Sequence, residues 1–229
     1  MKYKNLTIIG TSHISKESMN QVENFIEKQN PTVVALELDK KRAYALMHDH
    51  IKRSIGFSDI RRIGFKGYLF SLIGAWAEKK LGDMVGVSPG DEMKTALKLI
   101  KKNNLKVAYI DQDIDITLKR FSKTLTWKEK WNFIVDLFRG FVLKQKTYTF
   151  DLNKVPSKKI VDKMIKEVKV RYPNLYLVLV KERNIFMAKK LMHLIKLKPE
   201  DKILAIVGAG HEEEMIKLIK KNINKFDAV

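Results

Sequence analysis

The sequence predicts an α/β fold: a mainly parallel sheet of about four or more strands, covered by helices, with a large helical insertion before the last strand. Four short, continuous apolar runs occur along the chain, as expected for strands that are buried on both faces of a parallel sheet. Segments with helical spacing of apolar residues lie between these runs, which is typical of strand–helix–strand units. The third and fourth runs are separated by a long stretch of helical character.

The first two strands each lead into a helix. Residues 6–9 form a short apolar run that ends at Gly10, and Ser15 is placed to cap the helix that follows. Asn30-Pro31 ends this helix, because proline restricts the residue before it. Residues 32–36 form the second strand. After it, Asp39 is expected to cap a helix that runs to about residue 50.

The middle of the chain is rich in glycine. Residues 51–90 contain seven of the 11 glycines, and we expect one amphipathic helix at about residues 66–81, flanked by loops, that could act as a lid or an oligomer contact. Asp91 is then expected to cap a helix over residues 92–102. Residues 107–110 form the third strand.

The remaining elements complete one domain. Residues 114–200 are expected to be a helical insertion, with breaks near residues 124–126, 147–156 and 172–173. Residues 203–207 form the fourth strand, and a last helix spans about residues 212–223. We therefore expect residues 1–229 to form a single α/β domain.

The composition is basic and contains no cysteine. The net charge is +19, and 37 of the 45 basic residues are Lys. Solvated helix faces are the first explanation of this excess; an anionic membrane surface is the next explanation, and nucleic acid is not favoured because its readers tend to use Arg. The absence of cysteine excludes disulfides and thiolate metal sites and fits the cytoplasm. No apolar stretch reaches the length of about 18 residues that a membrane span needs.

Four polar residues follow the ends of the four expected strands: His13, Glu37, Asp111 and His211. Ligands of open α/β sheets bind beyond the carboxyl ends of the strands, so these side chains are expected to converge there. Asp111 can serve there as a ligand or as a helix cap.

Two of the strand ends carry the same Gly-x-x-His pattern. Gly10 precedes His13 by three residues, and Gly208 precedes His211 by the same interval. Two histidines and the Glu37 carboxylate are a common ligand set for a divalent metal with an open position. The alternatives are two unrelated histidines in turns, and a Glu37 that forms a salt bridge with Arg42 or Lys40.

Several blocks of the sequence, in the same order along the chain, resemble the TraB/PrgY family. They are Gly10-Thr11-Ser12-His13, Glu37-Leu38-Asp39 with Arg42, Pro89-Gly90-Asp91-Glu92-Met93, Asp111-Gln112-Asp113-Ile114, Thr117-Leu118 with Arg120, Glu182-Arg183, and Val207-Gly208-Ala209-Gly210-His211. The family is related to Tiki-type proteins, which have paired Gly-x-x-His motifs and are described as metal-dependent proteases. Bacterial members are associated with the shutdown of peptide pheromone signalling.

The resemblance implies a metal-dependent hydrolase acting on peptides, with His13, Glu37 and His211 as metal ligands. Arg42, Glu182 and Arg183 are expected around them in catalytic roles: Glu182 as a general base or an outer partner, and either arginine as a stabiliser of negative charge. Because adjacent helical residues point about 100° apart, only one of Glu182 and Arg183 is expected to face the site. Without a metal, His13 would be the base and Glu37 would orient it.

The resemblance extends to cofactors, partners and location. The metal is expected to be Mn, Co or Zn, with no organic cofactor. Peptides or proteins are the expected partners, with homo-oligomers also considered. Archaeal and bacterial members often have a C-terminal membrane region, so a cytoplasmic domain attached to a membrane through such a region is expected.

Three residues depart from the family pattern. Gln112 replaces an Arg, Asn184 replaces an Asp, and Glu214 stands where the family tends to have Gly. The first two changes remove charges, which favours an alternative function: a catalytically weak module that binds or sequesters peptides.

Other residues receive structural interpretations. Trp127 and Trp131 are expected to pack on one helix face. His48, His50 and His193 are expected to be ordinary surface histidines, and the Glu212-Glu213-Glu214 run is expected to complement a helix dipole.

Overall fold

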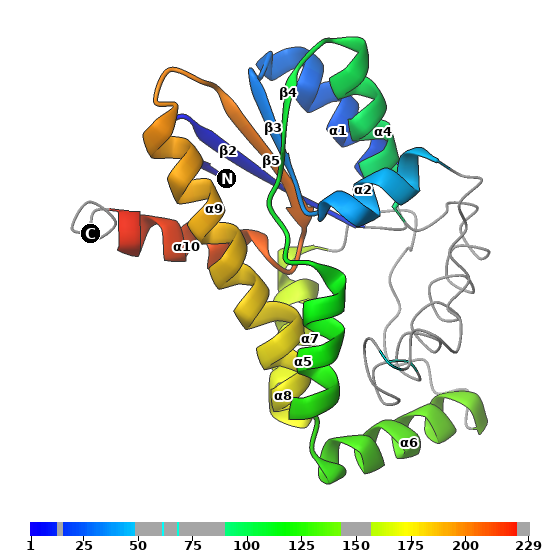
Figure 1. Cartoon of the computed structure of the whole chain (residues 1–229). Helices are drawn as coiled ribbons and strands as arrows, with labels where there is room; N and C mark the ends of the chain where they lie inside the picture. The colour runs from blue at the N-terminus through cyan, green and yellow to red at the C-terminus, as the bar shows by residue number, and fades with distance from the viewer. Residues whose placement is uncertain (13–15, 49–60, 62–67, 69–89, 143–156, 224–229) are drawn as a thin grey trace.

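The computed structural model describes residues 1–12, 16–48, 61, 68, 90–142 and 157–223 (Figure 1). Three of the features expected from the sequence lie outside these residues: His13, the cap at Ser15 and His50. The expected helix at residues 66–81 also lies outside them, except for Tyr68.

The sheet has five strands in the order β1-β2-β5-β3-β4. The bounds are Lys2–Tyr3 for β1, Leu6–Thr11 for β2, Val33–Leu36 for β3, Lys106–Tyr109 for β4 and Ile203–Gly208 for β5. All pairs are parallel except β1 with β2. The α/β class and the four predicted strands are confirmed. Strand β1 was not predicted, because two residues are too few to show a pattern.

Helices cover both faces of the sheet (Figure 1). Helices α1 (Lys16–Gln29), α2 (Lys40–Met47) and α4 (Asp91–Lys102) pack on the face that presents Val34, Leu36 and Ile206. Helices α9 (Arg183–Leu197) and α10 (Glu212–Asn222) pack on the other face, against Ile8 and Ala205. Alternate residues of the central strands therefore serve two hydrophobic cores, which is why their sequences are apolar throughout.

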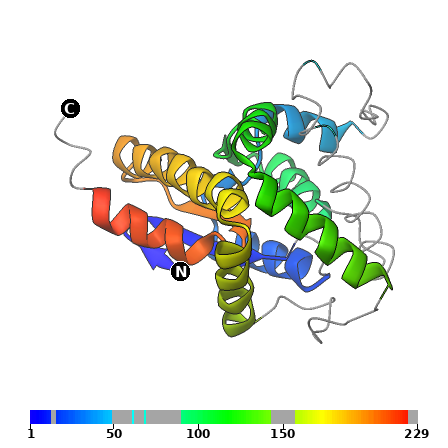
Figure 2. The ribbon, with the colours of Figure 1, turned by 90° about the horizontal axis from the view of Figure 1, so that it is seen from below.

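The helical insertion lies beyond the carboxyl ends of the strands (Figure 1). It contains α5 (Ile114–Thr124), α6 (Trp127–Val142), α7 (Lys158–Arg171), α8 (Pro173–Tyr176) and a wider π-helical segment, η1 (Leu177–Glu182), that continues into α9. In Figure 2, which views the molecule from below, α6 lies on the near side, away from the sheet. Through α9, the insertion is connected directly to the sheet core.

Three local predictions were wrong. Asp91 is the first residue of α4 rather than its cap; the cap position is Gly90, whose φ of 89° suits glycine. Helix α2 ends at Met47, although Asp39 caps it as predicted by accepting bonds from two backbone N–H groups. Trp127 and Trp131 do not pack: their side chains are exposed, because α6 turns a different face inward.

Within the residues that the structure describes, no helix is long and apolar enough to cross a membrane.

Leu191 tests the contribution of α9 to the core. It is fully buried, so Leu191→Ala should lower the free energy of unfolding by about 2–5 kcal/mol, through lost burial and a residual cavity. Leu197 lies on the same helix but is 60% exposed, so Leu197→Ala should change stability by less than about 0.5 kcal/mol. Urea denaturation of both variants measures the difference, and equal losses would contradict the assigned packing.

Candidate functional site

A buried ion-pair network joins the ends of the strands. Glu37 follows β3, Asp111 follows β4, and both carboxylates are almost completely buried. Arg183, the first residue of α9, binds both of them. Its Nε donates to Asp111 Oδ1 at 3.0 Å, and its Nη2 donates to Asp111 Oδ2 at 2.7 Å and to Glu37 Oε1. One guanidinium therefore connects two strand ends to the helical insertion.

Arg42 extends the network from the opposite side. Its Nη2 donates to Asp111 Oδ2, and its Nε donates to Asp39 Oδ2 at 2.7 Å. Asp39 uses its other oxygen to cap α2. Among the described residues, Glu37 forms its salt bridge with Arg183, and not with Arg42 or Lys40 as the salt-bridge alternative proposed. Asp111 is not a helix cap, since Asp113 caps α5.

The charges of the network stabilise each other. Burial disfavours a charged guanidinium, but the nearby charges and hydrogen bonds of Glu37 and Asp111 outweigh it and raise the pKa of Arg183 above its ordinary value. Two guanidinium groups face three carboxylates, including Asp39. Removing one member of such a buried set leaves a desolvated charge, which costs far more than the loss of a surface ion pair.

Glu182 and Arg183 point in different directions, as helical geometry requires. Arg183 faces the strand ends, where its Nη1 also donates to the backbone oxygen of Leu179 in the π-helical segment at 3.1 Å. Glu182 pairs instead with Arg120 of α5 at 2.9 Å, in a partly exposed position. Glu182 is therefore a partner of α5 and does not belong to the network around Glu37, so the structure gives no support to its expected role as a general base.

His211 lies beside Glu37 at the end of β5. The backbone N–H of Gly208 donates to Glu37 Oε2 at 2.6 Å, which fixes the carboxylate against the β5 turn. Three residues later, His211 occupies the cap position of α10, and its Nε2 lies 3.3 Å from Glu37 Oε1. Two of the three predicted metal ligands are thus in contact.

A chain of hydrogen bonds orients the imidazole of His211. Its Nδ1 lies 2.6 Å from Asn184 Oδ1, and Asn184 Nδ2 donates to Glu214 Oε2 at 2.8 Å. Tyr176 also donates to Glu214 Oε2, at 3.2 Å. Burial and the Glu214 charge raise the pKa of Tyr176, so its hydroxyl remains a donor. Because a carboxylate only accepts, Asn184 turns its amide nitrogen to Glu214 and its oxygen to His211, whose Nδ1 must then donate.

This orientation leaves His211 Nε2, the nitrogen without a proton, facing a carboxylate oxygen. With the proton on Nδ1, the second nitrogen faces Glu37 Oε1, and a positive charge between these two atoms would stabilise the arrangement. A metal ion between the two atoms would meet this need. A histidine that donates its other N–H to an oxygen acceptor is the usual arrangement at metal sites. The separation of 3.3 Å also suits two ligands of one ion, each about 2.0–2.2 Å from it.

These two residues fit a divalent metal as part of a ligand set. The third ligand expected from the sequence, His13, lies outside the described residues. Within the part of the chain that the structure describes, no group of three His, Asp or Glu side chains is arranged to hold an ion. Glu37 and His211 would therefore need a further ligand.

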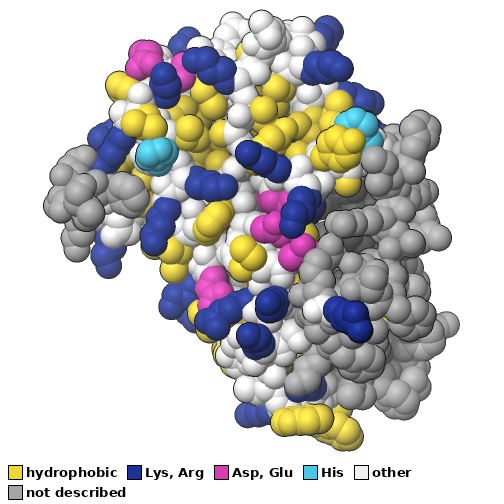
Figure 3. Space-filling view, in the orientation of Figure 1, with side chains coloured by type: hydrophobic (Ala, Val, Ile, Leu, Met, Phe, Trp, Pro, Cys, Tyr) yellow, Lys and Arg dark blue, Asp and Glu magenta, His cyan; other side chains and the backbone are white. Residues whose placement is uncertain are grey.

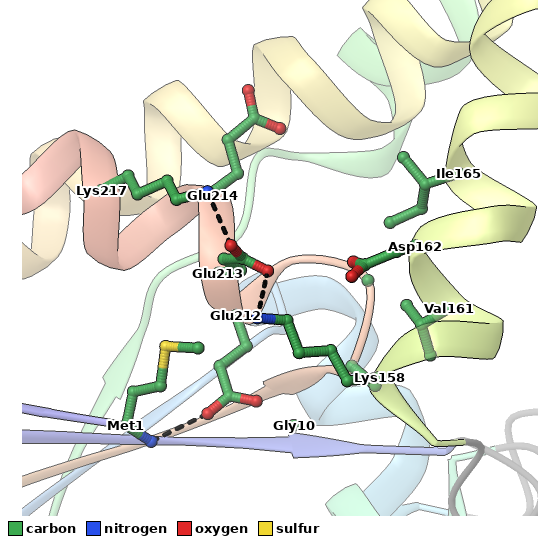
Figure 4. Close-up of a pocket in the computed structure, with 12 residues that line it drawn as sticks. Met1, Gly10, Lys158, Val161, Asp162, Ile165, Glu212, Glu213, Glu214 and Lys217 are labelled. Atoms are coloured by element: carbon green, nitrogen blue, oxygen red, sulfur yellow. Dashed lines mark hydrogen bonds and ion pairs between the residues drawn. The ribbon is translucent and has the colours of Figure 1, made fainter.

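Two pockets lie near the site. The first, of about 500 Å³, lies between α7 and the start of α10, next to Gly10. Figure 4 shows Glu213 bound there by both Lys158 and Lys217, and the chain that orients His211 reaches this pocket at Glu214. The second pocket, of about 530 Å³, has Asp39 and Asp111 in its wall. The first pocket thus meets the hydrogen-bond chain of His211 and the second meets the ion-pair network, and each is large enough for a small ligand.

The second pocket is bounded by basic and aromatic side chains. Lys190 of α9 donates to the backbone oxygen of Tyr109 at 2.9 Å and lies over the Phe186 ring. Burial lowers the pKa of Lys190, although Asp111 opposes this shift. Lys41 binds Asp113 and Asp115 at the same opening. Figure 3 shows basic and acidic side chains gathered together on this face of the molecule.

The comparison with known families confirms the family that the motifs indicated. The domain is a helix-covered, mainly parallel sheet with a buried polar site at the strand ends. The sequence profile of the TraB/PrgY/gumN family matches residues 2–222, so the chain belongs to this family.

Its relatives come from archaea and mammals. An uncharacterized protein of Methanocaldococcus jannaschii is 37% identical over 223 residues, which cover 96% of this chain and 54% of the relative. TraB domain-containing proteins of Homo sapiens and Bos taurus are 24% and 25% identical over 228 residues; each match covers 89% of this chain, and 60% and 59% of the relatives. The chain thus spans a little over half the length of these relatives.

Arg183 should dominate the stability of the site. Arg183→Met leaves Glu37 and Asp111 buried without their shared cation, so the free energy of unfolding should fall by about 3–5 kcal/mol. Arg120→Met is the matched control, because it removes the half-exposed partner of the preceding residue, Glu182, and should lower the stability far less. Similar losses in the two variants, measured by denaturation, would contradict the special role of Arg183.

Glu214 should determine which nitrogen of His211 carries the proton. Glu214→Gln introduces a side chain that both donates and accepts, so the Asn184 amide can turn over and both ring forms should appear. Nitrogen NMR of the histidine rings should show the Nδ1–H form of His211 in the unaltered protein and a mixture in the variant. Glu213→Gln, which alters a carboxylate paired with lysines, should leave the His211 signals unchanged. A single unchanged form in Glu214→Gln would contradict the assignment.

Proposed function

We propose that this protein is a hydrolase of peptides that uses a divalent metal held by His211, Glu37 and His13. The observation that carries the proposal is the approach of His211 Nε2 to Glu37 Oε1, at 3.3 Å, with the opposite ring nitrogen held by Asn184. Peptides as the substrate class are suggested by the resemblance to the TraB/PrgY family.

The residues of the site then have separate tasks. Arg183 and the Gly208 N–H fix the Glu37 carboxylate in one orientation, and Asn184 fixes the imidazole of His211. A bound divalent metal supplies Lewis acidity towards a peptide carbonyl. Arg42 is about one-third exposed, so it is the guanidinium of the network placed to approach negative charge on a substrate. Arg183 is committed to two carboxylates and acts as a positioning residue.

Metal binding is tested first. The protein is stripped with a chelator and dialysed against Mn, Co or Zn, and bound metal is measured by elemental analysis. We expect one site whose affinity falls by about tenfold or more in Asn184→Ala, which releases the ring of His211, and further in His211→Ala. His193→Ala is the control, because His193 is an exposed histidine of α9. Equal metal content in His211→Ala and His193→Ala would contradict the proposed ligand set.

Turnover is tested separately, with a mixed peptide library followed by mass spectrometry. Cleavage that stops on chelation and returns with Mn or Co supports the proposal. Full activity in chelator, lost in His13→Ala, would favour a metal-free site in which His13 is the base and Glu37 orients it. Peptide binding without cleavage under every metal condition would make the protein a sequestering module.

A further inference from the structure

Helix α6 buries a carboxylate of its first turn. Glu129 is only 2% exposed, and its carboxylate accepts bonds from the backbone N–H groups of Thr126 and Asn174. Asn174 Nδ2 donates to the same carboxylate at 2.9 Å. These donors outweigh the effect of burial and lower the pKa of Glu129, so it remains a carboxylate that anchors the first turn of α6 to α8.

The next turns of α6 are anchored in the same manner. Asn132 donates to the backbone oxygen of Arg171 at 3.3 Å. Asp136, seven residues after Glu129 and so on the same side of the helix, binds the Arg171 guanidinium and the Tyr172 hydroxyl. Three polar side chains therefore hold α6 against the end of α7 and the start of α8.

This arrangement leaves two indole rings on the outside. Trp127 and Trp131 are separated by one helical turn, and their side chains are 82% and 67% exposed. Glu129 lies midway between them in sequence and so on the opposite side of the helix. The inward polar bonds fix this orientation, so the tryptophans cannot turn towards the protein core without breaking them. Large apolar side chains fixed outwards in this way mark an interaction surface.

The exposed charged residues close to the two tryptophans in sequence are basic. From residue 116 to residue 131, the exposed charged side chains are Lys119, Arg120, Lys123 and Lys128. Lys130 also lies over the Trp127 ring, 4.3 Å from its centre. Indole rings favour the headgroup level of a bilayer, and lysine favours its anionic lipids. A second copy of this chain is disfavoured, because each copy carries a net charge of +19.

We propose that Trp127, Trp131 and Lys128 of α6, together with Lys123 in the last turn of α5, dock the protein onto an anionic lipid surface. The indoles enter the headgroup region, while the lysines remain at the phosphate level. The inward bonds of Glu129 and Asp136 keep the face preformed, so docking requires no ordering of the helix.

Co-sedimentation with vesicles tests this proposal. We expect the protein to bind vesicles of phosphatidylcholine and phosphatidylglycerol, to bind pure phosphatidylcholine much more weakly, and to dissociate as salt is raised. The double variant Trp127→Ala/Trp131→Ala should bind the anionic vesicles at least about tenfold more weakly. The double variant Lys123→Gln/Lys128→Gln should reduce the salt dependence of vesicle binding. Tyr44→Ala is the control: it removes a 57% exposed aromatic side chain from α2 and should bind as the unaltered protein does.

Several results would overturn the proposal. One is the absence of vesicle binding by the unaltered protein. Another is vesicle binding that the tryptophan variant retains in full. A third is tryptophan-dependent self-association, or tryptophan-dependent binding of nucleic acid, in place of vesicle binding. All substituted side chains are exposed, so thermal melting should be unchanged and a lost interaction can be assigned to the surface.

Discussion

The interaction on which the site depends is the salt bridge from Arg183 to Glu37 and Asp111. It brings together the ends of β3 and β4, and Glu37 extends it to β5 through the Gly208 N–H. Carboxylates at these buried strand ends would be destabilising without a buried cation. The helical insertion provides that cation, because Arg183 begins the helix that returns from the insertion to the core.

The same helix also controls the histidine. Arg183 and Asn184 are neighbours, and together they reach the two sides of the Glu37–His211 pair: the guanidinium binds the carboxylate, and the amide binds the imidazole. The wider turns of η1 precede them directly, and such turns are frequent at functional sites. A displacement of α9 would therefore alter the carboxylate and the imidazole at once.

The sequence predicted most of the sheet and part of the site. Continuous apolar runs located four strands, and the rule for strand ends brought Glu37, Asp111 and His211 together. Local sequence patterns could not predict the salt bridge between Arg183 and Glu37, because the two residues lie 146 positions apart along the chain. The burial of Glu129 was also hidden, since its partner Asn174 lies 45 residues further along the chain.

Two departures from the family pattern are coupled in space. Considered separately, Asn184 removes a carboxylate near His211, and Glu214 adds one in a helix start, where the dipole alone would explain it. In the structure, Asn184 Nδ2 donates to Glu214 Oε2 and Asn184 Oδ1 lies 2.6 Å from His211 Nδ1, so one amide connects the Glu214 carboxylate to the ring. The amide at position 184 fixes the orientation of the imidazole through its oxygen, while its nitrogen binds the Glu214 carboxylate. The pair thus aligns His211 Nε2 with Glu37 Oε1, so an amide at position 184 is compatible with an intact site.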